Sequence, residues 1–472
     1  MTRTVGTAVR RTPRREPLLT RDARPFTVAG TASVALLLAG TRWASYIGVN
    51  PIFLTDVLLL LAVYLIGTRA IRRPDQVFLR TGRGGSPLPL LAALAFVLLR
   101  LVMGGDLSLV ALRDAFPYVY TAAGLLALYA VRRTGEAGRR NTFRVFVAAL
   151  IFHAVWFVAQ EAVPALPYLL PTLNATQGVH LFTPRPDVDT TLVGVLGALI
   201  LWRMLHGGRH PVLLGLAYAG TFAAVAASFT RAGLLGAVVA SAYVVFATLS
   251  ERGRSPHRKL LIVAVVPIVL ISGVVAVSFT GVGAKLIATV APSAVTGNAV
   301  ADGAEGTTRA RSNAWDRLVQ WTFADQQRTI IGVGYGPDFL AQSGASVLLV
   351  GDAIDDDVRP RSPHDYWLGT LARMGLIGLA LILAAVVQFL VRSWRLRRSA
   401  TLDPATLLLI LVPLSLIVPA SLGVVLESPF AAVPFWWCLG AVLGTAIPTT
   451  TVPGRRARGR VRASAARPGI RR

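Results

Sequence analysis

Long apolar stretches alternate with short polar segments along most of the chain. A transmembrane helix needs roughly 17–25 predominantly apolar residues, and each stretch approaches that length. The stretches cover 26–48, 51–67, 87–103, 115–131, 145–163, 190–205, 211–229, 232–249, 260–280, 366–391, 405–426 and 429–448. The pattern therefore predicts an all-α integral membrane protein with about 12 transmembrane helices.

The segments between these helices differ in charge on the two sides of the predicted membrane. With the N-terminus inside, the cytoplasmic segments hold 35 Lys and Arg residues against 6 acidic residues, and the rest of the chain holds 13 against 17. Cytoplasmic segments of membrane proteins are enriched in Lys and Arg. We therefore expect both termini to be cytoplasmic.

This topology divides the chain into five parts. They are a cytoplasmic Arg-rich tail at 1–25, transmembrane helices one to nine at 26–280, an extracytoplasmic loop at 281–365, transmembrane helices ten to twelve at 366–448, and a second cytoplasmic Arg-rich tail at 449–472. The first tail has no clear small-residue cleavage site, so we expect it not to be a removed signal peptide. The outer loop is expected to be partly helical.

Composition agrees with a membrane protein and excludes several other classes. Hydrophobic residues make up 54% of the chain and charged residues only 15%, which excludes disordered and secreted disulfide-rich proteins. The net charge of +25 comes mostly from Arg clusters between apolar stretches and at the termini. This placement is typical of residues that set the orientation of a membrane protein, and it fits nucleic-acid binding less well. The single cysteine, Cys438, is expected to be a packing residue.

Ionisable residues inside or at the edges of the predicted helices gather at one level. These are Asp56, Arg100, Glu161, Arg231, Arg373 and Glu427. In the predicted topology all of them lie in the outer third of the membrane or at its outer surface. A charged side chain at such a depth is energetically costly and often marks a functional site. Any single one of these residues could instead extend its charge to the membrane surface or pair with a group on another helix.

The second half of the outer loop contains two candidate elements. Arg311 and Trp315 lie one helical turn apart, so they share a face, which either lies on the bilayer surface or directs Arg311 into a site. The alternating glycines at 332–336 predict a turn in preference to a phosphate-binding loop. The acidic run 355–357 is expected to be a solvated loop and not a metal site.

The tenth predicted helix is preceded by a helix-start pattern. Ser362 fits the N-cap, Pro363 the first helical position and Asp365 the third, which makes His364 the second helical residue. His364 is then either an interfacial residue beside aromatic side chains or a proton-transfer group. The residues alone leave both interpretations open.

Arg231 lies on the short outer connection 228–233 between the seventh and eighth predicted helices. A guanidinium group in this position suits bidentate capture of a phosphate. The alternative is contact with lipid headgroups, which a turn this short allows less freely.

Three motifs in this order resemble the O-antigen ligase and polymerase superfamily of integral-membrane glycosyltransferases. They are Ser-x-Thr-Arg-Ala-Gly at 228–233, the Arg311 to Trp315 helix leading into the glycine turn at 330–339, and Ser-Pro-His-Asp-Tyr-Trp at the start of 362–379. The last is similar to the family's His-Asn-x-Tyr-Leu signature, with Asp365 where the family often has Asn. The resemblance covers about 190–391, and 182–192 is loosely similar to a family stretch that usually contains Pro-Asn.

The resemblance implies an inverting, metal-independent and cofactor-free glycan transfer at the outer face of a bacterial cytoplasmic membrane. The donor would be an undecaprenyl-diphosphate-linked glycan and the acceptor a hydroxyl of a glycan or lipid-linked molecule. By similarity, Arg231 and Arg311 would hold the diphosphate and His364 would help to deprotonate the acceptor. Further candidates for diphosphate or sugar contacts are Arg309, Tyr335, Arg359, Arg361 and Tyr366.

Two other functions fit a protein with many membrane spans. A 12-span secondary transporter would place charges near the midplane and show two related halves, neither of which the sequence displays. A flippase for lipid-linked glycans would need polar residues along a path through the membrane, and the chain offers few. The residues do not choose between a polymerase and a ligase.

Overall fold

The computed structural model describes residues 24–49, 52–72, 85–105, 107–228, 230–251, 299–350, 361–397 and 402–446. Within these residues the chain is mostly helical, as predicted. The predicted span 260–280, the acidic run 355–357 and Arg359 lie outside the described residues.

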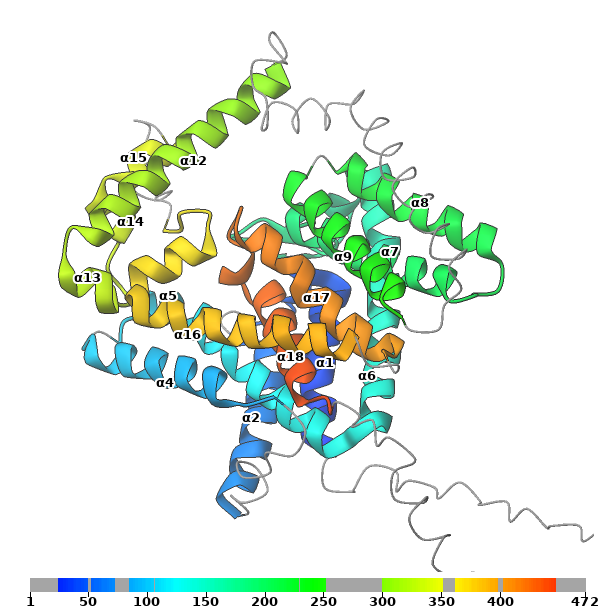
Figure 1. Cartoon of the computed structure of the whole chain (residues 1–472). Coiled ribbons are helices and arrows are strands. Elements are labelled where there is room, and N and C mark those ends of the chain that lie inside the picture. Colours follow the sequence, from blue (N-terminus) through cyan, green and yellow to red (C-terminus); the bar gives the residue numbers. More distant parts are fainter. Residues whose placement is uncertain are drawn as a thin grey trace, which may run out of the picture.

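The described helices follow the predicted apolar stretches in order (Figure 1). The N-terminal and middle helices are α1 (Arg24–Ala44), α2 (Leu54–Arg72), α4 (Leu88–Met103), α5 (Leu109–Val119), α6 (Thr121–Ala162), α7 (Pro186–Leu205), α8 (Pro211–Ala227) and α9 (Arg231–Leu249). The later helices are α12 (Ala299–Phe323), α13 (Gln326–Ile331), α14 (Phe339–Ser343), α15 (Ala345–Val350), α16 (Tyr366–Arg397), α17 (Pro404–Ala420) and α18 (Pro429–Gly444).

Short elements complete the described chain. Two antiparallel hairpins, β1 (Gly48–Val49) with β2 (Ile52–Phe53) and β3 (Thr172–Asn174) with β4 (Val179–His180), connect helices. Single 3-10 turns are η1 (Leu166–Leu169) and η4 (Val425–Glu427).

Four of the described helical stretches are long and apolar enough to cross a membrane. They are Leu109–Ala162, Pro186–Leu205, Arg231–Leu249 and Tyr366–Arg397. Shorter apolar helices are Leu54–Leu65, Leu88–Met103, Pro211–Ala227, Pro404–Ala420 and Pro429–Gly444. The first stretch contains the region predicted as two spans, 115–131 and 145–163, with a non-helical residue at Gly135. The count of 12 spans stays a prediction.

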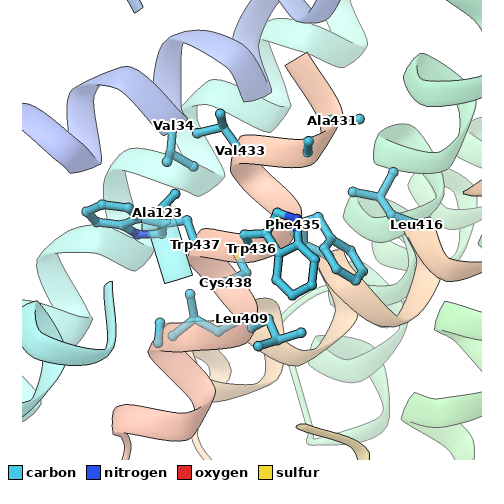
Figure 2. Packing of buried hydrophobic residues seen from close by; sticks show 14 of the residues in the cluster. Val34, Ala123, Leu409, Leu416, Ala431, Val433, Phe435, Trp436, Trp437 and Cys438 are labelled. Carbon is cyan, nitrogen blue, oxygen red and sulfur yellow. The ribbon is translucent and has the colours of Figure 1, made fainter. Parts of the chain in front are cut away.

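The apolar core is centred on α18, which is buried along almost its whole length. Figure 2 shows its side chains Phe435, Trp436 and Cys438 among residues of neighbouring helices. A Cβ on Gly440 would lie 1.9 Å from the backbone oxygen of Gly124 in α6, so these two helices touch backbone to backbone. Small residues at such seams allow close helix packing in membranes, where van der Waals contact drives association.

The segment α12 to α15 lies at the N-terminal end of α16, apart from α7 to α9 (Figure 1). Ala314 and Leu318 of α12 pack with Phe339 and Leu340 of α14, and Ala372 of α16 closes this small cluster. The predicted helix around Arg311 is therefore present. The apolar face of α12 packs against α14 and α16. The polar face of α12 therefore lies beside the start of α16.

Candidate active site

Chain segments far apart in sequence meet around the start of α16. Trp315 of α12 donates its indole N–H to the carbonyl of Pro363 at 2.7 Å. Arg311, one turn earlier, donates from Nη1 to the carbonyl of Leu422 at 3.1 Å. Trp367 of α16 in turn donates its indole N–H to the Ser421 hydroxyl at 2.8 Å. These bonds tie α12, the start of α16 and the α17–α18 connection into one unit.

His364 precedes α16 and adopts a left-handed backbone with φ 57°. This conformation is uncommon for a residue with a side chain, and such strain clusters at functional sites. The prediction that the helix starts at Ser362 was wrong, because α16 begins at Tyr366. Asp365 is the cap instead, since its carboxylate accepts from the N–H groups of Trp367 and Leu368 at 2.8 and 3.0 Å.

The corrected helix start explains two polar residues beside His364. An N-cap favours Asp and Asn almost equally, so Asp365 preserves the local structure that an Asn would give. The Ser362 hydroxyl does not cap α16 and instead donates to Oε1 of Glu427 at 2.6 Å. It also accepts the backbone N–H of His364 at 3.3 Å, which helps to hold the strained backbone.

The environment of His364 keeps its imidazole neutral. Burial, together with the positive charges of Arg311 and Arg185, lowers the pKa of His364 to about 4. A neutral imidazole has one ring nitrogen free to accept a proton. The side chain is therefore in the protonation state that a base requires, although its basicity is low while the two guanidinium charges are unneutralised.

Arg231 is the first residue of α9, and its neighbours fix that helix end. Gly233 packs so closely on α7 that an added Cβ would lie 1.6 Å from Oγ1 of Thr190. No side chain caps the helix at Thr230. The helix N-terminus and the guanidinium group of Arg231 therefore both favour an anion here.

Arg311 is electrostatically coupled to Arg231 across the site. Burial, followed by the charge of Arg231, lowers the pKa of Arg311, while Asp187 opposes this shift. Guanidinium groups that repel one another in a partly buried place indicate an anion-binding site, because a bound anion relieves the repulsion. Arg311 is thus electrostatically coupled to both Arg231 and His364 in this structure.

Arg185 is a further cation of this site that the sequence analysis did not select. It immediately precedes α7, and its Nε lies 3.0 Å from Oδ1 of Asp187. Its charge acts on His364 as that of Arg311 does. The signal in the sequence was its position in 182–192, the stretch that is loosely similar to a family segment.

The lower-ranked candidates lie in different surroundings. Arg309 is exposed on α12. Tyr335 and Tyr366 are buried, and both rings pack against Tyr118 at centroid distances of 5.9 and 5.7 Å. Their rings therefore form part of the protein interior in this structure. Arg361 is engaged in an ion pair, described below.

The glycine-rich segment 332–336 is a turn, as the first interpretation held. All three glycines have positive φ, and the N–H groups of Val333 and Gly334 donate to carbonyls of Ala372 and Arg373 at 2.9 Å. Those carbonyls lie just before the break of α16 at Gly375, φ 64°. The segment thus completes the hydrogen bonding of a broken membrane helix, which occupies two of its N–H groups.

A buried network of charges supports the turn and the segment before His364. Asp114 of α5 pairs with Arg361 at 2.7 Å and with Arg373 at 3.1 Å. Arg361 also donates to the carbonyl of Gly336 at 2.7 Å, and Arg100 donates to that of Gly332 at 3.0 Å. Arg100 and Arg373, two of the residues predicted at the outer level, therefore belong to this network.

Comparison with known proteins agrees with this geometry. Residues 214–383 match a family model described as O-Antigen ligase. The match includes α9, α12, the glycine turn, His364 and the N-terminal part of α16, and it confirms the resemblance to the O-antigen ligase and polymerase superfamily. A search of curated proteins finds no match to the chain.

Proposed function

We propose, from the O-antigen ligase match and the cationic site around a neutral His364, that the protein transfers a glycan from undecaprenyl diphosphate to an acceptor hydroxyl. The match supports O-antigen ligase-like glycan transfer in polysaccharide assembly, and the apolar helices indicate a multi-pass membrane protein. The observation that carries the proposal is the set of hydrogen bonds that holds Arg311, Trp315 and the His364 segment in one unit, where burial and nearby arginines lower the pKa of His364.

In the proposed step, the acceptor oxygen attacks the anomeric carbon of the donor sugar. The acceptor proton passes to the free ring nitrogen of His364, and a new glycosidic C–O bond forms. The bond between the anomeric carbon and the diphosphate oxygen breaks, and undecaprenyl diphosphate leaves with the electron pair. Arg231, Arg311 and Arg185 stabilise the negative charge that develops on it, and His364 then releases its proton to water.

Two further features follow from this step. A single displacement approaches the anomeric carbon opposite the diphosphate, so it inverts the configuration. The guanidinium groups supply the charge stabilisation that a divalent metal supplies in other transferases, so we propose a metal-independent reaction.

The basicity of His364 depends on the donor in this proposal. His364 becomes a stronger base when the diphosphate neutralises its cationic neighbours, so it acts as a base mainly in the donor-bound enzyme.

We place the site at the outer face of a bacterial cytoplasmic membrane, with both termini inside. The distribution of Lys and Arg supports this orientation. The acceptor is a glycan hydroxyl, as in a polymerase, or a hydroxyl of another surface molecule, as in a ligase. Transport is not favoured, because the matched family model is described as O-Antigen ligase.

The proposal is tested with the purified protein in lipid nanodiscs and undecaprenyl-diphosphate-linked glycan extracted from a deletion strain. The variants His364→Ala, Arg231→Ala, Arg311→Ala and Arg185→Ala are compared with wild type for transfer to membranes of the same strain. We expect His364→Ala to lower the rate by about 10²–10⁴-fold, and each Arg variant to lower kcat/KM by about 10-fold or more.

Matched controls come from the same chain. His210 also has a left-handed backbone, φ 58°, and is exposed before α8, so His210→Ala tests the loss of an equally strained histidine. Arg209→Ala removes an exposed arginine. Both are expected to transfer at the wild-type rate. Wild-type activity in all four site variants would refute the proposed function.

A further inference from the structure

A cavity lies beside the segment that precedes His364. Its volume is about 280 Å³, and it lies between α5, the segment before His364, α16 and the α17–α18 connection. Its polar lining consists of Arg113, Asp114, Arg361, Ser362, Arg373, Glu427 and Ser428. The apolar lining residues are Pro117 and Val424.

The cavity is joined to the proposed reaction centre by short connections. Ser362 lines it and accepts the N–H of His364 two residues later. Arg311 donates to the carbonyl of Leu422 on the α17–α18 connection. Val424, two residues after Leu422 on the same connection, lines the cavity. The cavity therefore lies next to the His364 segment, within one hydrogen bond of its backbone.

The charges of the cavity are largely balanced within its own walls. Asp114 pairs with Arg361 at 2.7 Å and with Arg373 at 3.1 Å, and Glu427 accepts the hydrogen bond of Ser362. Burial also raises the pKa of Glu427 above its ordinary value, partly opposed by the charge of Arg373. The walls carry Arg113, Arg361 and Arg373 against Asp114 and Glu427, but Arg361 and Arg373 are already engaged with Asp114, which disfavours binding of a second diphosphate.

What the walls offer is a mixture of acceptors and donors at close range. Carboxylate oxygens accept from hydroxyl groups, guanidinium groups donate to them, and serine hydroxyls do both. A sugar ring carries donors and acceptors around its edge in a compact neutral body, and it matches this lining.

We propose that this cavity binds one sugar ring of the acceptor and presents its hydroxyl to His364, which rests on the proposed function above. The volume is at the lower end of the range for ligand sites, about 300–1,000 Å³, so it suits a single ring and not a long glycan. The rest of the acceptor then extends outward from the site. Ser428, Glu427 and Arg373 are its binding residues.

The test uses transfer by nanodisc-held protein with extracted lipid-linked glycan as donor, and methyl glycosides of glucose, galactose and mannose as competitors. We expect at least one glycoside to inhibit wild-type transfer. Ser428→Phe, which fills the cavity, is expected to raise the inhibitory concentration at least tenfold and to raise the acceptor KM while leaving the donor KM within twofold. The control Thr176→Phe, an exposed position on the β3–β4 turn, is expected to behave as wild type.

A second variant covers the case in which Ser428→Phe fails to fold. Glu427→Gln keeps the side-chain size but removes the charge, and we expect it to raise the acceptor KM and weaken glycoside inhibition. Unchanged acceptor KM and inhibition in the folded variants, or no inhibition of wild type by any glycoside, would overturn the acceptor pocket. A raised donor KM instead would assign the cavity to the donor sugar. If wild type transfers nothing, the proposed function itself fails, which is a separate outcome.

Discussion

At the scale of single residues, the chemistry depends on a histidine whose basicity is controlled by its neighbours. Burial and the charges of Arg311 and Arg185 lower the pKa of His364 to about 4 in the absence of substrate. A diphosphate bound to those guanidinium groups would cancel their effect. The site is thus arranged so that donor binding strengthens the base.

This arrangement predicts different pH profiles for two kinetic constants. kcat/KM reports groups of the free enzyme, so its acid limb is expected near pH 4, where His364 becomes protonated. kcat reports the donor-bound enzyme, so its acid limb is expected at higher pH because the His364 pKa rises when diphosphate binds. Steady-state rates between pH 3.5 and 8 measure both, and His364→Ala should remove both limbs. Identical limbs in wild type would contradict the coupling.

Arg231, Arg311 and His364 could be proposed from the sequence, because each lies in a short motif whose order and spacing are visible, and their roles stay a prediction. Arg185 was missed because its significance depends on its electrostatic effect on His364, which is distant in the sequence, and no local pattern reveals that effect. The helix start was also placed wrongly. Ser362 and Asp365 are both good caps, and only the tertiary bond from Ser362 to Glu427 decides between them.

At the scale of elements, glycines set the geometry of the site. Gly332 in the turn and Gly375 in α16 both have positive φ, and a Cβ on either would lie 2.3–2.4 Å from backbone atoms of the other segment. The sequence predicted the turn at 332–336 correctly, but it could not show that the turn completes a broken helix. That relation is a long-range contact.

We expect Gly375→Ala to destabilise the protein by about 1–3 kcal/mol, because the left-handed backbone and the lack of space both oppose a side chain. Thermal unfolding in nanodiscs measures this as a lower Tm. Gly220→Ala is the matched control, since Gly220 is helical, has open space around its Cβ position and lies in α8. Equal Tm values for the two variants would show that the turn at 332–336 does not stabilise the break in α16.

The seam between α7 and α9 gives a second test at this scale. In Gly233→Ala the added Cβ would lie 1.6 Å from Oγ1 and 2.6 Å from Cβ of Thr190, so α9 and Arg231 must shift. We expect the donor KM to rise by about tenfold or more, since a misplaced guanidinium loses its charged hydrogen bonds.

The double variant Gly233→Ala with Thr190→Gly removes both clashing atoms. It is expected to recover most of the donor affinity that Gly233→Ala loses, because the two changes act at one contact. If the double variant is no better than Gly233→Ala alone, packing at this seam does not position Arg231.

At the scale of the whole molecule, hydropathy and the charge of the connections predicted the class of protein well. Helices occupy the predicted apolar stretches within the described residues, and four of these stretches are long enough to span a membrane. The topology of 12 spans remains a prediction, as does the sidedness of the site. Pairing of helices through small residues, such as Gly124 with Gly440, could not be predicted, because it depends on backbone contacts between distant segments.

The central claim is that the protein consumes a lipid-linked glycan, and the most direct measurement is the pool of that glycan in cells. Undecaprenyl-diphosphate-linked glycan is extracted from wild-type cells, from a deletion strain, and from the deletion strain carrying wild type, His364→Ala or His210→Ala. We predict accumulation in the deletion strain and with His364→Ala, and clearance with wild type and His210→Ala. Accumulated single repeats would indicate a lost polymerase and long chains a lost ligase, whereas an unchanged pool in the deletion strain would contradict the account.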